Sequence, residues 1–369
     1  MPPLIDELRA SVPLSGTAAG MLTTLPVVCM AVGATVVPRL TRRSGHELPL
    51  VLVGLAMAAG ILVRLAPNVV ALYVGTTIAG IGIALGNVLV PSLVKRDFHE
   101  RAGFMTGIYT MAISTSAGIA AGLTVPIEDL IGHGWRPALA VWALPALLCA
   151  AVWVPFARHP TAVADRRTQT PHRSSHLIRD RLAWQVALFM GVQSLMFYSL
   201  LSWLPSILQD HGMSKGASGA YLSLFTLLGI PVCFVVPMIA ARMRDQRALM
   251  FASVLFLGIG LLGLLASPGS ATIVWTFFAG ISQAATLALA FLFFVLRSRN
   301  QAEAAELSSM SQGIGYALAA LGPVIMGGLH EATGSWTAPL VFLLVLLVPE
   351  LVFGLEAARD RHVGGAEPG

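Results

Sequence analysis

The sequence predicts an all-α protein that crosses a lipid bilayer many times, and three observations support that fold class. Its composition is too apolar for a water-facing surface, because 56% of the residues are hydrophobic and only 11% are charged. Soluble domains carry about 25% charged residues. Apolar runs long enough to span a membrane recur along the chain, and basic residues are concentrated in every second loop between them.

Eleven apolar runs, each of roughly 20 residues or more, are the predicted membrane spans. Some connections between them are very short, such as Pro67-Asn68 and Pro268-Gly269-Ser270, so the helices that they join must be antiparallel. We expect the spans at residues 15–38, 48–66, 69–93, 102–125, 136–157, 182–206, 217–240, 248–267, 271–296, 304–328 and 337–356.

The orientation follows from the basic loops. Arginine and lysine follow the first, third, fifth, seventh, ninth and last runs and are scarce in the other loops. By the positive-inside rule the basic side is cytoplasmic. We therefore expect an inner-membrane protein with its C-terminus inside and, with eleven spans, Met1 outside. The net charge of +5 is accounted for by these loops, so no nucleic-acid partner is expected.

The chain also contains an internal repeat. An offset of 199 residues places Leu14–Arg43 on Met213–Arg242, with Val36-Val37-Pro38 on Val235-Val236-Pro237 before a basic cluster. Two parallel six-helix halves around a midplane site form the architecture of the major facilitator fold, which this pattern resembles. We expect a first half at residues 1–157, a cytoplasmic loop at 158–181, a second half at 182–358 and a cytoplasmic tail at 359–369.

The repeat leaves one helix without a counterpart. The second half begins with the run 182–206, and its equivalent in the first half would start about 20 residues before Met1. Two alternatives stay open at this point. Either a first helix precedes Met1 and completes twelve spans, or the protein has eleven spans and an external N-terminus.

The motifs of common enzymes are incomplete in this sequence. His46-Glu47, His99-Glu100 and His330-Glu331 begin like the zinc motif HExxH, but no second histidine follows at the required spacing. No Walker loop is present, which favours an ion gradient over ATP as the energy source. We therefore expect no enzyme activity, no metal and no cofactor.

Uncharged polar residues inside the spans are the main candidates for solute binding, because polar groups are costly in lipid. We expect four amides to hydrogen-bond the solute and three aromatic side chains to wall the cavity. The alternative for each of them is an interhelical hydrogen bond or an interface anchor. The amides are Asn87, Gln193, Gln283 and Gln312, and the aromatic residues are Tyr109, Tyr198 and Trp203.

Two charged residues inside the runs carry further alternatives. Arg64 lies near the outer end of its run, where it either snorkels to the interface or attracts an anionic substrate. Glu350 lies deep in the last run, where it either relays protons or contributes to bundle packing. The basic turn Arg39–Gly45 is either a latch between the halves or plain positive-inside charge.

Five stretches of the chain carry a resemblance to a known family. They are, in order, Leu22–Val28, Val63–Pro67, Val90–Arg96, Ser202–Pro205 and Gln312–Gly315. Together they resemble the cyanate permease branch of the major facilitator superfamily, which also includes nitroimidazole transporters. This resemblance implies proton-linked movement of a small anion or a small polar heterocycle. The family's Asn-x-Arg-Pro stretch, on its first helix, has no counterpart here.

The sequence thus predicts a monomeric transporter that works by alternating access in a lipid bilayer and performs no chemistry on its small-molecule substrate. Its energy source is expected to be a proton gradient. Two alternatives remain. The first is a drug or metabolite exporter of the same fold, because direction is not written in the sequence. The second is a non-transporting sensor or a truncated relic of a transporter.

Overall fold

The computed structural model describes residues 25–31, 47–131, 135–158, 177–266, 269 and 271–364, and every regular element within these ranges is a helix. This confirms the predicted all-α class. Within that part of the chain, eight helices are long and apolar enough to cross a membrane. The predicted run 15–38 lies outside the described residues except for the helical stretch 25–31, and each of the other runs overlaps a helix.

The described helices form two compact units. One consists of Met1–Val90 with Ala117–Arg173, and the other of Pro91–Ser116 with Ser174–Gly369. The division therefore passes through α5 (Val69–Asp97) and α6 (Ala102–Ile131). The halves predicted from the repeat, with their boundary at residues 158–181, stay a prediction.

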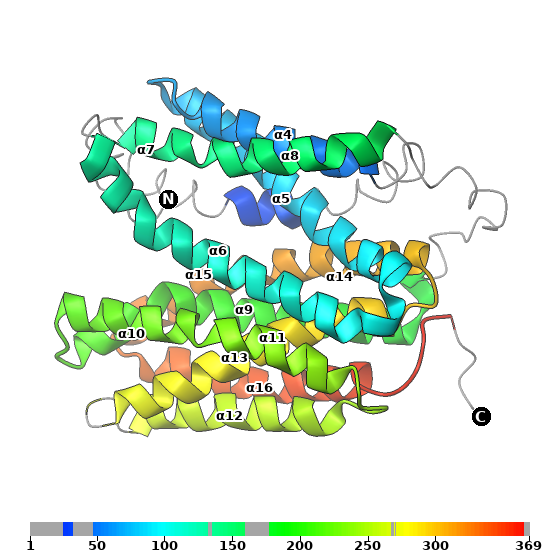
Figure 1. Cartoon of the computed structure of the whole chain (residues 1–369). Helices are drawn as coiled ribbons and strands as arrows, with labels where there is room; N and C mark the ends of the chain where they lie inside the picture. The colour runs from blue at the N-terminus through cyan, green and yellow to red at the C-terminus, as the bar shows by residue number, and fades with distance from the viewer. Residues whose placement is uncertain are drawn as a thin grey trace. The chain divides into compact units, whose positions relative to one another are not determined.

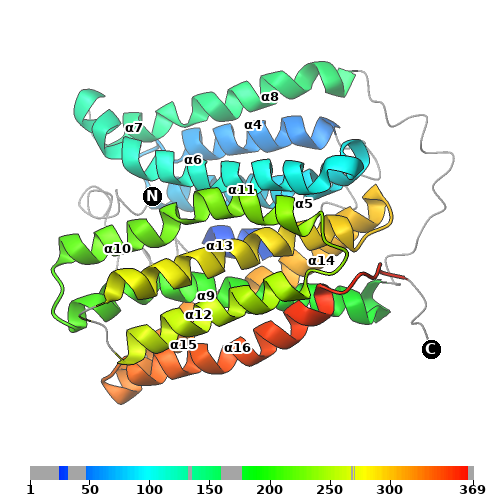
Figure 2. The ribbon, with the colours of Figure 1, turned by 60° about the horizontal axis from the view of Figure 1, so that its bottom comes forward.

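In the first unit, close helix packing depends on glycines. α4 (Glu47–Val63) lies beside α8 (Ala143–Arg158), which follows the short α7 (Trp135–Val141) (Figure 2). A Cβ atom on Gly54 of α4 would lie 2.7 Å from the carbonyl oxygen of Ala146. A side chain at this position would therefore push α4 and α8 apart, as expected where small residues let membrane helices approach closely.

The second unit is built around α9 (Arg181–Asp210), which contacts most of the other helices of this unit (Figure 1). Asp180 caps the start of α9 by accepting a hydrogen bond from the backbone N–H of Ala183 at 3.0 Å. The remaining helices of the unit are α10 (Lys215–Leu227), α11 (Gly229–Ala240), α12 (Arg247–Ala266), α13 (Thr272–Leu296), α14 (Gln301–Ala319), α15 (Leu321–Thr333) and α16 (Thr337–Ala357).

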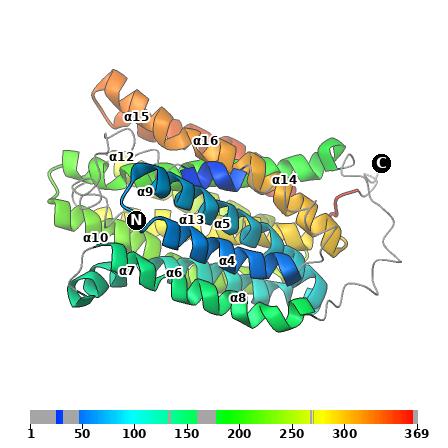
Figure 3. The ribbon, with the colours of Figure 1, turned by 90° about the horizontal axis from the view of Figure 1, so that it is seen from above.

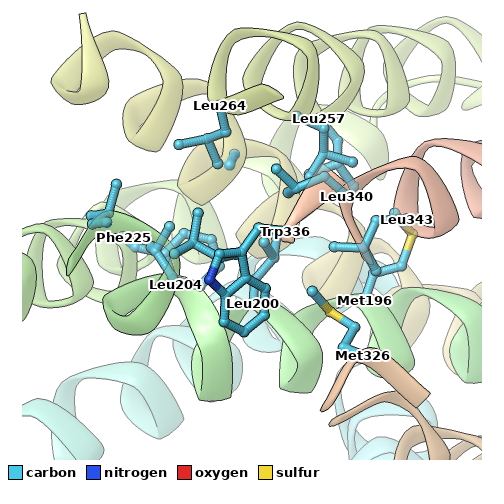
Figure 4. Close-up of a cluster of buried hydrophobic side chains, with 14 of the residues drawn as sticks. Met196, Leu200, Leu204, Phe225, Leu257, Leu264, Met326, Trp336, Leu340 and Leu343 are labelled. Carbon is cyan, nitrogen blue, oxygen red and sulfur yellow. The ribbon is translucent and has the colours of Figure 1, made fainter. Parts of the chain in front are cut away.

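The apolar core of this unit lies where α9, α12 and α16 meet (Figure 4). Met196 and Leu200 of α9 are completely buried there, as are Leu257 of α12 and Leu343 of α16. Because lipid tails are as apolar as leucine, such helices associate through close packing and not through a hydrophobic driving force. This core fixes the position of α9, which carries three of the predicted site residues.

Three predicted spans are each divided into two helices. The breaks fall at Trp142, Leu228 and Ala320, each three residues before a proline. Proline lacks the N–H that would bond to the carbonyl four residues earlier, so each helix loses one hydrogen bond at its break. α15 continues the line of α14 beyond Ala320 (Figure 3). Pro205 of α9 and Pro349 of α16 leave their helices uninterrupted, so proline alone does not decide where a span divides.

Candidate functional site

Three buried glutamines lie near the middle of the spans of the second unit. Gln193 lies on α9, Gln283 on α13 and Gln312 on α14, and all three are almost completely buried. Their carboxamides differ in how well they are paired. Nε2 of Gln193 donates to Ser194 Oγ at 2.7 Å, and Nε2 of Gln312 donates to Ser308 Oγ at 2.8 Å.

Gln283 has no such bonds. Its side chain is 1% exposed, and neither Oε1 nor Nε2 has a hydrogen-bond partner among the described residues. Oε1 of Gln193 is also buried and unpaired. Burying a polar group without a partner costs about 1–3 kcal/mol, so these atoms are expected to be satisfied by something other than the described protein groups.

Buried hydroxyl groups that sequence reasoning missed add to this polar layer. The Oγ atoms of Ser199 and Ser311 and Oγ1 of Thr276 are buried, and none has a hydrogen-bond partner within the described ranges. Thr276 lies seven residues before Gln283, which places both side chains on one face of α13. That spacing is the signal that would have added Thr276 to the predicted site.

Aromatic side chains lie on the helices next to these amides. The ring of Tyr109 on α6 packs edge-on against Phe291 of α13, with 5.4 Å between the ring centroids. On α9, Tyr198 packs edge-on against Phe197, and Phe197 in turn stacks on Phe225 of α10 at 6.0 Å. The structure therefore brings both predicted tyrosines into aromatic packing within the second unit.

Trp203 lies among the ends of α9, α15 and α16. Its Nε1 donates to the carbonyl oxygen of Pro323 at 2.9 Å, and its ring lies 5.4 Å from that of Trp336. Trp336 Nε1 donates to Asp210 Oδ2 at 2.6 Å, and the imidazole of His330 stacks on the Trp336 ring at 3.9 Å. Trp203 thus belongs to a network that joins these helix ends, and its bond to Pro323 is an interhelical hydrogen bond, the alternative that the sequence analysis gave for this residue.

Glu350 is completely buried in α16. Both carboxyl oxygens lack a hydrogen-bond partner among the described residues. Four residues further along the same helix, Gly354 lies against the side chain of Met250 on α12, so this face of α16 is turned toward α12. The buried arginine of the unit, Arg297, is bonded elsewhere, and no salt bridge to Glu350 occurs in the described part of the chain.

Asn87 and Arg64 lie in the first unit. Asn87 is half-buried on α5, and Arg64 follows the last residue of α4 with 8% of its surface exposed. The side chain of Arg64 fills the space beside Gly75 of α5, and its Nε atom has no hydrogen-bond partner in the described residues. The structure does not place these two residues relative to the glutamines of the second unit.

A buried hub closes one end of the second unit, and the sequence analysis did not identify it. Arg297 follows the last residue of α13, and its Nε donates to the carbonyl oxygen of Ala357 at 2.7 Å. Its Nη2 donates to the carbonyl oxygen of Ala358 at 2.9 Å and to Oε1 of Gln246. Burial lowers the pKa of Arg297 to about 10, so the guanidinium stays charged at neutral pH.

The first part of α6 packs against α11 along a strip of small residues, which we call the α6–α11 seam. Gly103, Gly107, Thr110 and Ser114 share one face of α6. A Cβ atom on Gly107 would lie 2.6 Å from the carbonyl oxygen of Phe234. Thr110 Oγ1 donates to the carbonyl oxygen of Cys233 at 2.6 Å, and Ser114 Oγ lies 3.7 Å from Cys233 Sγ. All of these residues belong to the second unit.

Comparisons with known proteins agree with the helical architecture. The chain matches the family described as Major Facilitator Superfamily over residues 1–320. It is 36% identical to the 2-nitroimidazole transporter of Escherichia coli (strain K12), over 98% of this chain and 91% of that protein. It is 29% identical to the cyanate transport protein CynX of the same organism, over 97% of this chain and 92% of that protein.

A solved structure shows the same fold. The proton:xylose symporter XylE superposes with a TM-score of 0.78 and 13% sequence identity, over 98% of this chain and 92% of that one. At this identity the likeness is one of fold alone. The two sequence relatives confirm the predicted cyanate and nitroimidazole branch, and they identify the chain as a multi-pass membrane transporter and not an enzyme.

Proposed function

The chain belongs to the Major Facilitator Superfamily, and we propose that it moves a small anion or a small polar heterocycle across the inner membrane by alternating access, driven by a proton gradient. The relatives support the solute class, because one is described as a 2-nitroimidazole transporter and another as a cyanate transport protein. We further propose that the protein acts as a monomer. The basic loops support the proposal that its C-terminus lies in the cytoplasm.

The observation that carries this proposal is the layer of buried amides in the second unit. Gln193, Gln283 and Gln312 lie near the middle of their helices, and buried carboxamide atoms of Gln193 and Gln283 are unpaired. A polar group near the bilayer midplane without a protein partner is a default candidate for solute contact. Tyr109, Tyr198 and Trp203 supply aromatic surface, whereas Asn87 and Arg64 are the proposed contribution of the first unit.

Glu350 is the proposed proton carrier. A fully buried carboxyl group without partners is far less costly as a neutral acid than as a carboxylate. Binding a proton from one side and releasing it to the other would link its charge to the transport cycle. The alternative is a neutral acid that only fills space in the packing of α16. Glu350→Gln keeps the shape of the neutral acid and separates the two roles.

The test is solute flux in vesicles that contain the purified full chain. 2-Nitroimidazole and cyanate are supplied as labelled solutes, with and without an imposed pH gradient and then with a protonophore. We expect accumulation of one of them that requires the gradient and collapses with the protonophore. In Glu350→Gln we expect downhill exchange to persist while the pH gradient no longer drives accumulation.

Two results would contradict parts of this proposal. Gradient-driven accumulation that survives in Glu350→Gln would assign that residue to packing. An absence of flux for both solutes, in vesicles that hold folded protein, would contradict transport of this solute class.

A further inference from the structure

Gln283 differs from the other buried glutamines of the second unit because its whole carboxamide is unpaired. Nε2 of Gln193 and Nε2 of Gln312 each donate to a serine hydroxyl one or four residues away. Gln283 has neither a donor bond nor an acceptor bond within the described residues. Exchanging the positions of its oxygen and nitrogen atoms would not alter this, because both ends are unpaired.

The residues next to Gln283 along α13 pack against α10 and α11, and Thr276 shares the face of α13 on which Gln283 lies. One turn away on α13, Gly280 lies against the backbone of Phe225, whose ring stacks on Phe197 (Figure 4 shows Phe225). The next residue of α13, Ala284, packs against Gly229, where α11 begins. Backbone of α10 and small residues of α11 therefore lie against the neighbours of Gln283 on α13.

The charged residues that are buried in the described part of the second unit make no contact with Gln283 that the structure shows, because each is bonded elsewhere or lies on another helix face. Arg297 is bonded to Gln246, Ala357 and Ala358 at the end of α13. Glu303 lies in the first turn of α14, where its carboxylate accepts the backbone N–H of Arg299 at 2.8 Å. Glu350 lies on the face of α16 that is turned toward α12. Gln283 therefore offers a ligand one donor group and one acceptor without charge, and the hydroxyl group of Thr276 lies on the same face of α13.

We infer that Gln283 is a specificity-determining residue that binds the solute through a pair of hydrogen bonds, with Nε2 donating and Oε1 accepting. A ligand that satisfies both atoms carries an N–H or O–H donor directly beside an acceptor, as 2-nitroimidazole does with its ring N–H and an oxygen of the adjacent nitro group. An anion without hydrogen, such as cyanate, accepts from Nε2 and leaves Oε1 buried and unpaired. This inference rests on the proposed function, and within it the heterocycle is selected over the anion.

The size of the expected effect follows from the unpaired oxygen. Sites built to bond an N–H or O–H group of their substrate reject analogues that lack it by factors of up to about 10⁴–10⁵ in enzymes. A single lost bond to a neutral amide gives about a tenfold change or more. We therefore expect removal of the solute's N–H to reduce transport at least tenfold, with the effect confined to protein that retains Gln283.

The experiment compares three solutes in vesicles that contain the full chain, at a pH that keeps the ring N–H protonated. The solutes are 2-nitroimidazole, its 1-methyl derivative, which has the same ring but no N–H, and cyanate. The proteins are the wild type, Gln283→Met, which keeps the volume and removes both polar atoms, and Gln283→Asn, which keeps the carboxamide on a shorter stem. Membrane abundance and thermal stability are measured for each protein.

We expect the wild type to prefer 2-nitroimidazole over both other solutes at least tenfold. Gln283→Met should be as abundant as the wild type and should lose that preference, whereas Gln283→Asn should retain part of it. Equal transport of the 1-methyl compound by the wild type, or an unchanged preference in Gln283→Met, overturns the inference and leaves the proposed function standing. A wild type that prefers cyanate over 2-nitroimidazole would also overturn the inference and leave the proposed function standing. An absence of flux for all three solutes in folded protein overturns the proposed function and the inference together.

Discussion

Two glutamines of the second unit have the same burial and opposite surroundings. Gln246, just before α12, and Gln283, in the middle of α13, are each 1% exposed. Nε2 of Gln246 donates to the carbonyl oxygens of Ala240 at 3.0 Å and Met243 at 2.7 Å, and its Oε1 accepts from Arg297. Gln283 has no bonds of this kind. Burial alone therefore does not distinguish a structural amide from a candidate binding amide, whereas the pairing of its atoms does.

The largest effect is expected at the paired amide. Gln246→Leu leaves a buried guanidinium without one of its acceptors and two carbonyl oxygens without a donor. We expect it to lower the free energy of unfolding by about 3 kcal/mol or more, because removing one partner of a buried charge leaves that charge uncompensated. Thermal unfolding of the purified protein in detergent measures the change. A stability equal to that of the wild type would mean that the hub around Arg297 is not a structural element.

A smaller loss of stability is expected for a substitution in the α6–α11 seam, where the two helices pack too closely for an added side chain. Gly107→Leu forces a side chain against the carbonyl oxygen of Phe234, and overpacking of this kind costs about 1–3 kcal/mol. Gly219→Leu on α10 is the matched control, because a Cβ atom there meets no atom within 4 Å. Equal stability of the two variants would show that the seam is looser than the structure indicates.

The smallest effect is expected at the unpaired amide. Gln283→Met replaces an unsatisfied polar group by an apolar one of similar volume, so we expect the free energy of unfolding to stay within about 1 kcal/mol of the wild type or to rise. The same detergent assay measures it, with Gln246→Leu as the contrasting variant. If Gln283→Met lowered the free energy of unfolding as much as Gln246→Leu, Gln283 would have structural partners. The two glutamines would then not differ in the way described above.

Much of the fold could be predicted from the sequence, because a helix that crosses a lipid bilayer must be about 20 residues long and mostly apolar. Apolar runs such as 182–206 and 271–296 predicted α9 and α13 within a few residues. The division of three spans at Trp142, Leu228 and Ala320 was not predicted, because Pro205 shows that a proline can also lie inside an unbroken helix. The run 15–38 is described only at residues 25–31.

The candidate site was predicted in its composition but not in its pairing. The sequence identified Gln193, Gln283 and Gln312 as polar residues inside apolar runs, and all three are buried. The serines that pair with Gln193 and Gln312 are one and four residues away, but whether an amide also has partners on other helices depends on residues that are distant in the chain. Arg297 and Gln246, for example, are 51 positions apart in the chain. The roles of the proposed solute-binding residues and of Glu350 remain predictions that the flux experiments test.

The α6–α11 seam has a consequence for hydration. Its contacts on the α11 side include the carbonyl oxygens of Phe234 and Cys233, reached by Gly107 and Thr110, beside the edge-on ring pair of Phe104 and Phe234. If these helices separate during a transport cycle, the newly uncovered surface is rich in hydrogen-bond acceptors. Water entering between them would find peptide oxygens to bind beside the phenylalanine rings. Glycine has no side-chain rotamers, so it loses no side-chain conformational entropy when the helices close. Water can therefore enter and leave this strip in each cycle with little change in side-chain conformation.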